Sequence, residues 1–245
     1  MITSYIRAVK AESLKLKRSP MWLAFFALPL ISAFFGTMNY KLNIGILKSE
    51  WYSLWSQHTL FLCYFFMPAL IGTYCSYLWR LEHTRHNWNS FLTAPLPLFV
   101  LYLGKLSQAA RVTVLGNLWI FFLFYVSGKL AGIRSPFPSE ALEWFLCGTI
   151  AGMVICCVQL LLSLVIRSFA VPIGLALAGG ILGLYMTNHD YGMNYPYSIY
   201  CLGMRANNPS MEISVSTLVI NSVGYIVVFA ALSVFYLRKH EISAS

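Results

Sequence analysis

Charged side chains are scarce in this sequence, and their scarcity excludes an ordinary soluble fold. Asp, Glu, Lys and Arg make up only 10% of the 245 residues, whereas a soluble domain has about 25%. Hydrophobic residues reach 58%, above the roughly 45–50% that soluble domains contain. The surplus is too large for a single soluble core.

Common catalytic and metal-binding motifs are also missing. There is no G-x-x-x-x-G-K-[ST] loop to hold ATP and no G-x-S-x-G nucleophile turn. The six cysteines include no C-x-x-C pair, which argues against a zinc site or a disulfide framework. Histidine is the only ionisable residue type expected deep inside a span, which argues against a proton-coupled pump. We therefore expect a chain that is not an enzyme, with no catalytic residues, no metal and no cofactor of its own.

Long uncharged runs are what the sequence does contain. A helix needs roughly 20 apolar residues to cross about 30 Å of hydrocarbon, and lipid favours helices because it offers no partner to free backbone groups. The runs predict an all-α integral membrane protein with a single domain, residues 1–245. The six predicted spans are about residues 20–39, 58–79, 98–128, 142–166, 169–188 and 213–237.

The basic residues are divided unevenly between the two sides of this topology. With the N-terminus inside, 12 of the 17 Lys and Arg residues lie on the inner side, so the whole net charge of +9 lies there. Because cytoplasmic loops carry the excess of Lys and Arg, we expect a multi-pass protein of a cell membrane with both termini in the cytoplasm. This asymmetry explains the net positive charge of the chain, so no nucleic-acid partner is expected.

The first 18 residues have an amphipathic pattern. Ile2, Ile6, Val9 and Leu16 recur at helical spacing, and basic residues cover most of the remaining surface. The pattern predicts an interfacial helix over residues 1–18, with its apolar side toward membrane lipid and its basic side toward anionic headgroups. The alternative is a charged topology signal without a docked helix.

The segment between spans two and three, residues 80–93, is polar but has one apolar face. That face consists of Leu81, Trp88 and Leu92. The offsets of seven and four predict a short amphipathic helix in the cytoplasm. We expect Trp88 to fill a pocket of a partner, with Glu82 and Arg85 at the rim.

The same segment contains two histidines, His83 and His86, which a helix would place one turn apart. They could share a metal, but the order Glu-His-x-x-His differs from the H-E-x-x-H of metalloproteases. No third strong ligand lies nearby in the sequence. Contact with a partner is therefore preferred over a metal site.

A long segment before the last span, residues 189–210, is rich in tyrosine, glycine and proline. Its tyrosines are Tyr191, Tyr195, Tyr197 and Tyr200. Because tyrosine favours the membrane interface, we expect a re-entrant or interface-lying element. Trp51 and Trp55, ahead of span two, would complete an outer aromatic belt. These residues would either contact a substrate or only anchor the chain.

Two G-x-x-x-G pairs, Gly148 with Gly152 and Gly179 with Gly183, predict close packing in spans four and five. Together these features resemble the permease subunits of ABC-2 type exporters. Within the first hundred residues the motifs are similar to the lantibiotic immunity permeases found with epidermin-, mutacin- and nisin-type peptides. The similar segments are residues 10–19 (KAESLKLKRS), 55–71 (WSQHTLFLCYFFMPALI), 75–83 (CSYLWRLEH), 87–89 and 92–95.

The resemblance implies a membrane subunit of an ATP-driven exporter. Two copies of a separate ATPase, which holds ATP and Mg, would bind the permease, and residues 80–93 would be the coupling helix in the ATPase groove. A second permease subunit, different but related, would complete the complex. The implied cargo is a lantibiotic-type antimicrobial peptide, expelled from the membrane of a bacterial cell to give immunity or resistance. A non-transporting subunit that senses or sequesters a peptide, and a permease for another amphipathic substrate, are the alternatives.

Overall fold

The computed structural model describes residues 2–17, 19–84, 96–189 and 191–244, with side chains through residue 239. All regular elements in these ranges are helices. In chain order they are α1 (Ile2–Leu16), α2 (Met21–Leu42), α3 (Glu50–Phe61), η1 (Leu62–Phe66), α4 (Met67–His83), α6 (Leu98–Leu130), α7 (Ala141–Val165), α8 (Ala170–Asn188), η2 (Gly192–Asn194), α9 (Pro196–Gly203) and α10 (Val215–Ala244).

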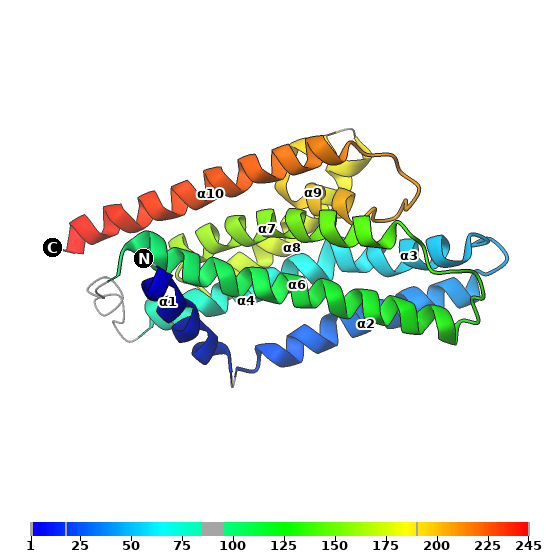
Figure 1. Cartoon of the computed structure of the whole chain (residues 1–245), viewed down its shortest axis with the longest axis horizontal. Coiled ribbons are helices and arrows are strands. Elements are labelled where there is room, and N and C mark those ends of the chain that lie inside the picture. The colour runs from blue at the N-terminus through cyan, green and yellow to red at the C-terminus, as the bar shows by residue number, and fades with distance from the viewer. Residues whose placement is uncertain (1, 18, 85–95, 190, 245) are drawn as a thin grey trace.

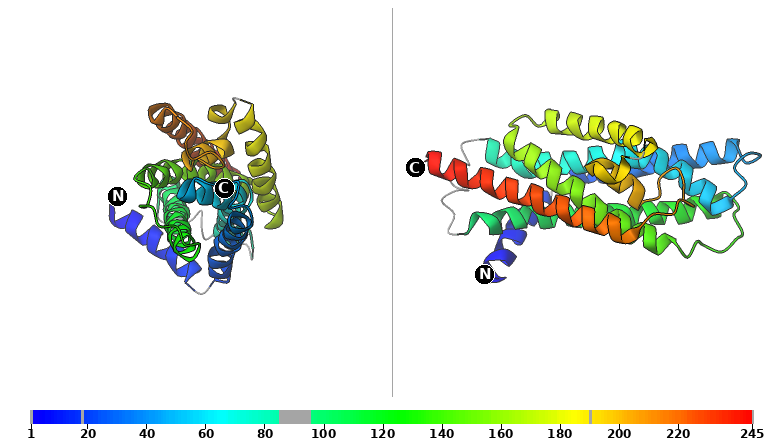
Figure 2. Two further views of the ribbon diagram at one scale, coloured as in Figure 1. Left: turned by 90° about the vertical axis from the view of Figure 1, so that its right-hand side faces the viewer. Right: turned by 90° about the horizontal axis from the view of Figure 1, so that it is seen from above.

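The long helices run side by side along one axis, and the two ends of this bundle differ (Figure 1). One end, which we call the termini end, holds α1, the end of α4, the start of α6 and the last turns of α10. The opposite end, the far end, holds the loops that join α2 to α3 and α6 to α7. The short helix α1 crosses the bundle at an angle to the long helices, as the further views also show (Figure 2).

Six helices of the described chain are long and apolar enough to cross a membrane. This confirms the predicted all-α membrane fold with six spans. The spans are Met21–Leu42, Glu50–His83, Leu98–Leu130, Ala141–Val165, Ala170–Asn188 and Val215–Lys239. Five of them begin and end within three residues of the predicted ranges, whereas the second is longer at both ends.

The second span is longer because α3 packs into the bundle despite its polar composition. Trp51 and Trp55 are 2% and 0% exposed, and the rings of Trp55 and Trp144 stack with their centroids 5.3 Å apart. The π-helical turn η1 then joins α3 to α4 directly before Pro68. Proline has no backbone N–H to give to the helical ladder, so an irregular turn is expected at this point.

Helix α9 packs between α7 and α8 instead of lying over their ends. All its residues from Tyr197 to Gly203 are buried. A Cβ atom at Gly148 would lie 2.2 Å from the Met204 sulfur, and one at Gly179 would lie 2.7 Å from the Tyr197 ring. The G-x-x-x-G glycines thus allow close packing, as predicted, and the segment that they receive is α9 with Met204. The segment predicted to be re-entrant or interface-lying, residues 189–210, therefore contains a helix that packs inside the bundle.

Candidate functional site

Four charged side chains from three helices meet at the termini end of the bundle. We call them the charge cluster: Glu12 and Lys15 of α1, Glu82 of α4 and Lys105 of α6. The Lys15 ammonium lies 2.7 Å from a carboxylate oxygen of Glu12 and 2.7 Å from one of Glu82. The Lys105 ammonium lies 3.1 Å and 2.7 Å from the same two oxygens. Each ammonium therefore bridges both carboxylates.

The local sequence explains why these groups meet. Glu12 and Lys15 are three residues apart on α1 and so share a face of that helix. Ala8, Glu12 and Leu16, each four residues apart, form the buried face of α1. That face reaches the backbone of α6 because Gly104 has no side chain, and a Cβ there would lie 3.1 Å from the Ala8 methyl carbon.

Three members of the charge cluster are almost completely removed from water, whereas the Lys15 side chain is 27% exposed. Lys105 is 0% exposed, Glu82 3% and Glu12 6%. Burying a charge is costly unless it is paired and hydrogen-bonded, and here two carboxylates balance two ammonium groups. Lys105 also donates to the Leu78 carbonyl oxygen at 2.6 Å, and its ammonium lies 4.6 Å from the Trp79 ring centroid.

The two carboxylates also raise the pKa of Lys15. Burial of the Lys15 side chain acts to lower its pKa, but the negative charges of Glu12 and Glu82 outweigh this effect and raise it above 10.5. Lys15 is therefore charged at neutral pH. One oxygen each of Glu12 and Glu82 is buried without a hydrogen-bond partner in the described part of the chain, so the carboxylates depend on the two lysines.

The last turn of α4 is fixed to a fourth helix as well. The His83 Nε2 atom donates to the Ser163 carbonyl oxygen of α7 at 2.8 Å, and the Ser76 and Ser163 hydroxyl oxygens are 3.2 Å apart. The Arg80 guanidinium lies 5.2 Å from the Phe169 ring centroid. A displacement of the end of α4 therefore acts on α1, α6 and α7 together.

The structure corrects the expected position of Glu82. The carboxylate was expected at the rim of a docking face, but it is buried and paired with Lys15 of α1 and Lys105 of α6. Leu81 is half-buried in the same last turn. Arg85, Trp88 and Leu92 lie outside the described residues, so their predicted positions on a helix stay predictions.

The prediction of which residues form the lipid-facing apolar side of α1 is also partly wrong. Ile2 and Ile6 are 77% and 45% exposed, and Val9 is half-buried, but Leu16 is only 4% exposed. Leu16 belongs to the buried face of α1 against the bundle, because it follows Glu12 by one helical turn. A pattern of apolar residues alone does not separate a face that meets lipid from one that meets another helix.

The aromatic residues expected in an outer belt are mostly inside the bundle. The Trp51 indole donates to the Ser135 carbonyl oxygen at 3.0 Å, and that of Trp55 to the Met204 carbonyl oxygen at 2.8 Å. Tyr197 and Tyr200 are 5% and 0% exposed. The prediction of an outer aromatic belt is therefore wrong for Trp51, Trp55, Tyr197 and Tyr200. These four side chains are buried because α3 and α9 are parts of the bundle.

Tyr191 and Tyr195 differ from the other tyrosines of this segment. Tyr191 is 61% exposed and Tyr195 is half-buried. The two buried tyrosines bond polar side chains of the spans instead. The Tyr200 hydroxyl donates to Asn117 at 3.0 Å, and the Gln159 amide donates to the Tyr197 hydroxyl at 2.6 Å.

Sequence reasoning missed Glu12, Lys15 and Lys105 as site residues. Lys105 was expected only among the basic residues of the inner side, but it is fully buried in α6. The available signal was a lysine with apolar neighbours on both sides, because a lysine is almost never fully buried unless it is paired. In the described ranges, no group of three His, Cys, Asp or Glu residues could hold a metal, and His86 lies outside them.

Comparison with known proteins gives one match. Residues 8–183 match the family model described as ABC-2 family transporter protein. This range contains all four residues of the charge cluster and extends from α1 to Gly183 of α8. No curated protein matches the chain.

Proposed function

The chain belongs to the ABC-2 family of transporter proteins and forms a permease subunit of an ABC transporter; we propose that it expels a lantibiotic-type antimicrobial peptide from the membrane. The family match over residues 8–183 carries the transport role. The peptide cargo is supported by the resemblance of residues 55–71 and 75–83 to lantibiotic immunity permeases. ATP is hydrolysed on a separate ATPase subunit, which this family of permeases requires.

In this proposal, residues 80–93 transmit the movement of the ATPase to the spans. Residues 85–93 follow directly after the last turn of α4, whose Glu82 is paired with Lys15 and Lys105. A push on this segment displaces the end of α4, and the charge cluster transfers the displacement to α1 and α6. The His83 bond to the Ser163 carbonyl oxygen transfers it to α7. The buried pairs make these helices move as one group.

The proposed complex contains two copies of the ATPase, with its ATP and Mg, and a second, related permease subunit. It lies in the cell membrane with both termini of this chain in the cytoplasm. A reporter fused after Ser245 is then cytoplasmic, and reporters inserted near Ser135 or Asn194 are external. If a cysteine introduced at Asn194 can be labelled only after the cells are opened, this topology is wrong and the opposite one holds.

Docking of the ATPase is tested by Trp88→Ala and Leu92→Ala. Each variant should reach the membrane but recover little ATPase in a pull-down from detergent, because an indole at the centre of such a contact contributes about 2 kcal/mol or more. Leu130→Ala is the matched control, since Leu130 is 72% exposed at the far end. Full recovery of the ATPase with Trp88→Ala would exclude the docking role.

The peptide cargo is tested in cells that express the chain with its partner subunits. These cells should survive higher doses of a lantibiotic, and cells whose ATPase lacks its P-loop lysine should not. Resistance that persists with the inactive ATPase would favour a subunit that senses or sequesters the peptide. ATP-dependent export of a different amphipathic molecule, without lantibiotic resistance, would keep the transporter and exclude this cargo.

A further inference from the structure

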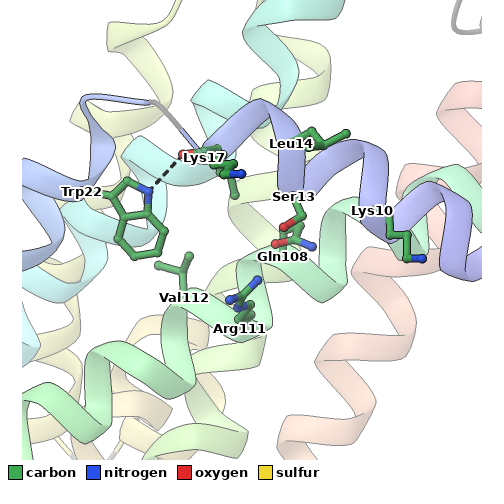
Figure 3. Close-up of a pocket in the computed structure, with 9 residues that line it drawn as sticks. Lys10, Ser13, Leu14, Lys17, Trp22, Gln108, Arg111 and Val112 are labelled. Atoms are coloured by element: carbon green, nitrogen blue, oxygen red, sulfur yellow. Dashed lines mark hydrogen bonds between the residues drawn. The ribbon is translucent and has the colours of Figure 1, made fainter.

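A pocket of about 490 Å³ lies between α1, α2 and α6 at the termini end. Its lining includes Lys10 of α1, Lys17 directly after α1 and Arg111 of α6, with no acidic residue among the lining side chains that the structure describes. Figure 3 shows α1 and α6 on opposite sides of the pocket, with the indole of Trp22 beside it. The pocket is therefore basic and has one aromatic wall.

These three cations differ from the lysines of the charge cluster. Lys15 and Lys105 each meet two carboxylates, whereas Lys10, Lys17 and Arg111 make no ion pair within the described ranges. All three are exposed. Positive charge gathered around a pocket without a protein counter-charge favours an anionic ligand.

The pocket also lies at a defined depth. Residues 112–128 form the uncharged part of α6 that follows Arg111 directly. At about 1.5 Å per residue this stretch covers roughly 26 Å, close to the thickness of about 30 Å for the hydrocarbon core. Arg111 thus marks the level at which the hydrocarbon ends and phosphate headgroups begin. The uncharged run of α2 begins at Met21, beside the pocket residue Trp22.

The remaining lining suits the part of a lipid next to its headgroup. Val112 and Leu16 are buried apolar residues of the pocket wall, and Leu14 of α1 is 70% exposed at the same site. The Trp22 indole is held in place because its N–H donates to the Leu16 carbonyl oxygen at 3.0 Å. Cations above an apolar wall fit a phosphodiester that carries acyl chains better than they fit a free anion.

From this geometry we propose that the pocket binds the phosphate headgroup of an anionic phospholipid, which bridges α1 to α6. Lys10, Lys17 and Arg111 contact the phosphate oxygens, and the guanidinium can hold two of them at once. Basic pockets between membrane helices bind such headgroups by the same chemistry. The site does not depend on the transported cargo, and it adds a lipid requirement to the permease.

The test measures lipid retention by the purified full chain in detergent, using native mass spectrometry. Phosphatidylglycerol and phosphatidylcholine are titrated together, and one phosphatidylglycerol per chain is expected to bind in preference. Lys10→Gln, Lys17→Gln and Arg111→Gln should each weaken its binding about five-fold, and the triple variant roughly a hundred-fold. Lys10→Arg with Lys17→Arg should retain it, which separates loss of charge from loss of fold.

The matched control removes three cations at the far end: Lys41→Gln, Lys48→Gln and Lys129→Gln. It should leave the bound phosphatidylglycerol in place. The proposal would be overturned if this control lost as much bound phosphatidylglycerol as the triple variant of the pocket. It would also be overturned if the wild-type chain retained phosphatidylcholine as well as phosphatidylglycerol. Displacement of the lipid by millimolar inorganic phosphate would assign the pocket to a free anion and overturn the lipid assignment. Brominated phosphatidylglycerol should quench the fluorescence of Trp22. Loss of this contribution to the quenching in Trp22→Phe would place the lipid in this pocket.

Discussion

Replacement of Lys105 by methionine should destabilise the protein more than any other loss of a single charge on α6. Lys105 is 0% exposed, and its ammonium contacts Glu12 at 3.1 Å, Glu82 at 2.7 Å and the Leu78 carbonyl oxygen at 2.6 Å. Without Lys105, one ammonium, that of Lys15, remains for two buried carboxylates. The variant therefore leaves an uncompensated negative charge in the bundle.

The magnitude follows from the cost of that charge. Removal of one partner from a buried ion pair costs about 3–5 kcal/mol. For a chain of this size, each 1 kcal/mol lowers the midpoint of thermal unfolding by roughly 2–4 °C. We therefore expect Lys105→Met to lower this midpoint by roughly 6–20 °C, measured in detergent by far-UV circular dichroism. Transport should be lost at temperatures at which the wild-type protein is active.

Two further variants make this prediction specific. Lys129→Met changes an exposed lysine on the same helix, whose ammonium lies 5.9 Å from the Trp51 ring centroid and 5.6 Å from that of Tyr125. It should cost about 0.5–1 kcal/mol. Adding Glu82→Gln to Lys105→Met restores the charge balance, so the double variant should be more stable than Lys105→Met alone.

The result that refutes this reasoning is equally definite. If Lys105→Met lowers the midpoint of thermal unfolding no more than Lys129→Met does, the buried pairs contribute nothing to stability. Additive losses in the double variant of Lys105 and Glu82 would show that the two side chains do not interact.

Three other perturbations follow from the structure. Gly180→Leu should prevent folding, as judged by gel filtration, because even a Cβ there would lie 2.2 Å from the Tyr64 carbonyl oxygen; Gly174→Leu is the control, with no atom within 4 Å of its Cβ position. Trp55→Phe should cost about 1–3 kcal/mol of unfolding free energy, because a buried carbonyl loses its donor. The pKa of Lys15 is raised above 10.5, so its contribution to stability is complete below that pH and is lost only as pH rises through the raised pKa. The difference in unfolding free energy between wild type and Lys15→Gln should then stay constant between about pH 7 and 9; a decrease within this range would contradict the pairing.

The sequence predicted the spans well because their signal is local. Residues 141–165 and 170–188 are long apolar runs, and a run of this length has few other stable arrangements. Most of helix α3 was left outside the predicted span, residues 58–79, because polar residues interrupt residues 50–57. Its burial depends on contacts with distant rings, such as those of Trp144 and Phe124.

The candidate site was harder to predict, since its members are far apart in the sequence. Glu12 and Lys105 are separated by 93 positions, and no pattern within either segment indicates the other. The tyrosines of α9 were misplaced for a related reason. Tyr197 and Tyr200 have the composition of an interface, but the grooves that receive them belong to α7 and α8.

The position of α9 has a consequence for the biosynthesis of the chain. Helices α7 and α8 are synthesised first, and their glycine-lined surfaces around Gly152 and Gly179 have no contact with α9 until residues 196–203 follow. A nascent chain that ends at Asn188 therefore has both spans but an open groove between them. Completion of this half of the bundle depends on a segment that must fold back after two helices have already been made. Translation past Gly203, rather than insertion of α8, is the step at which this groove is filled.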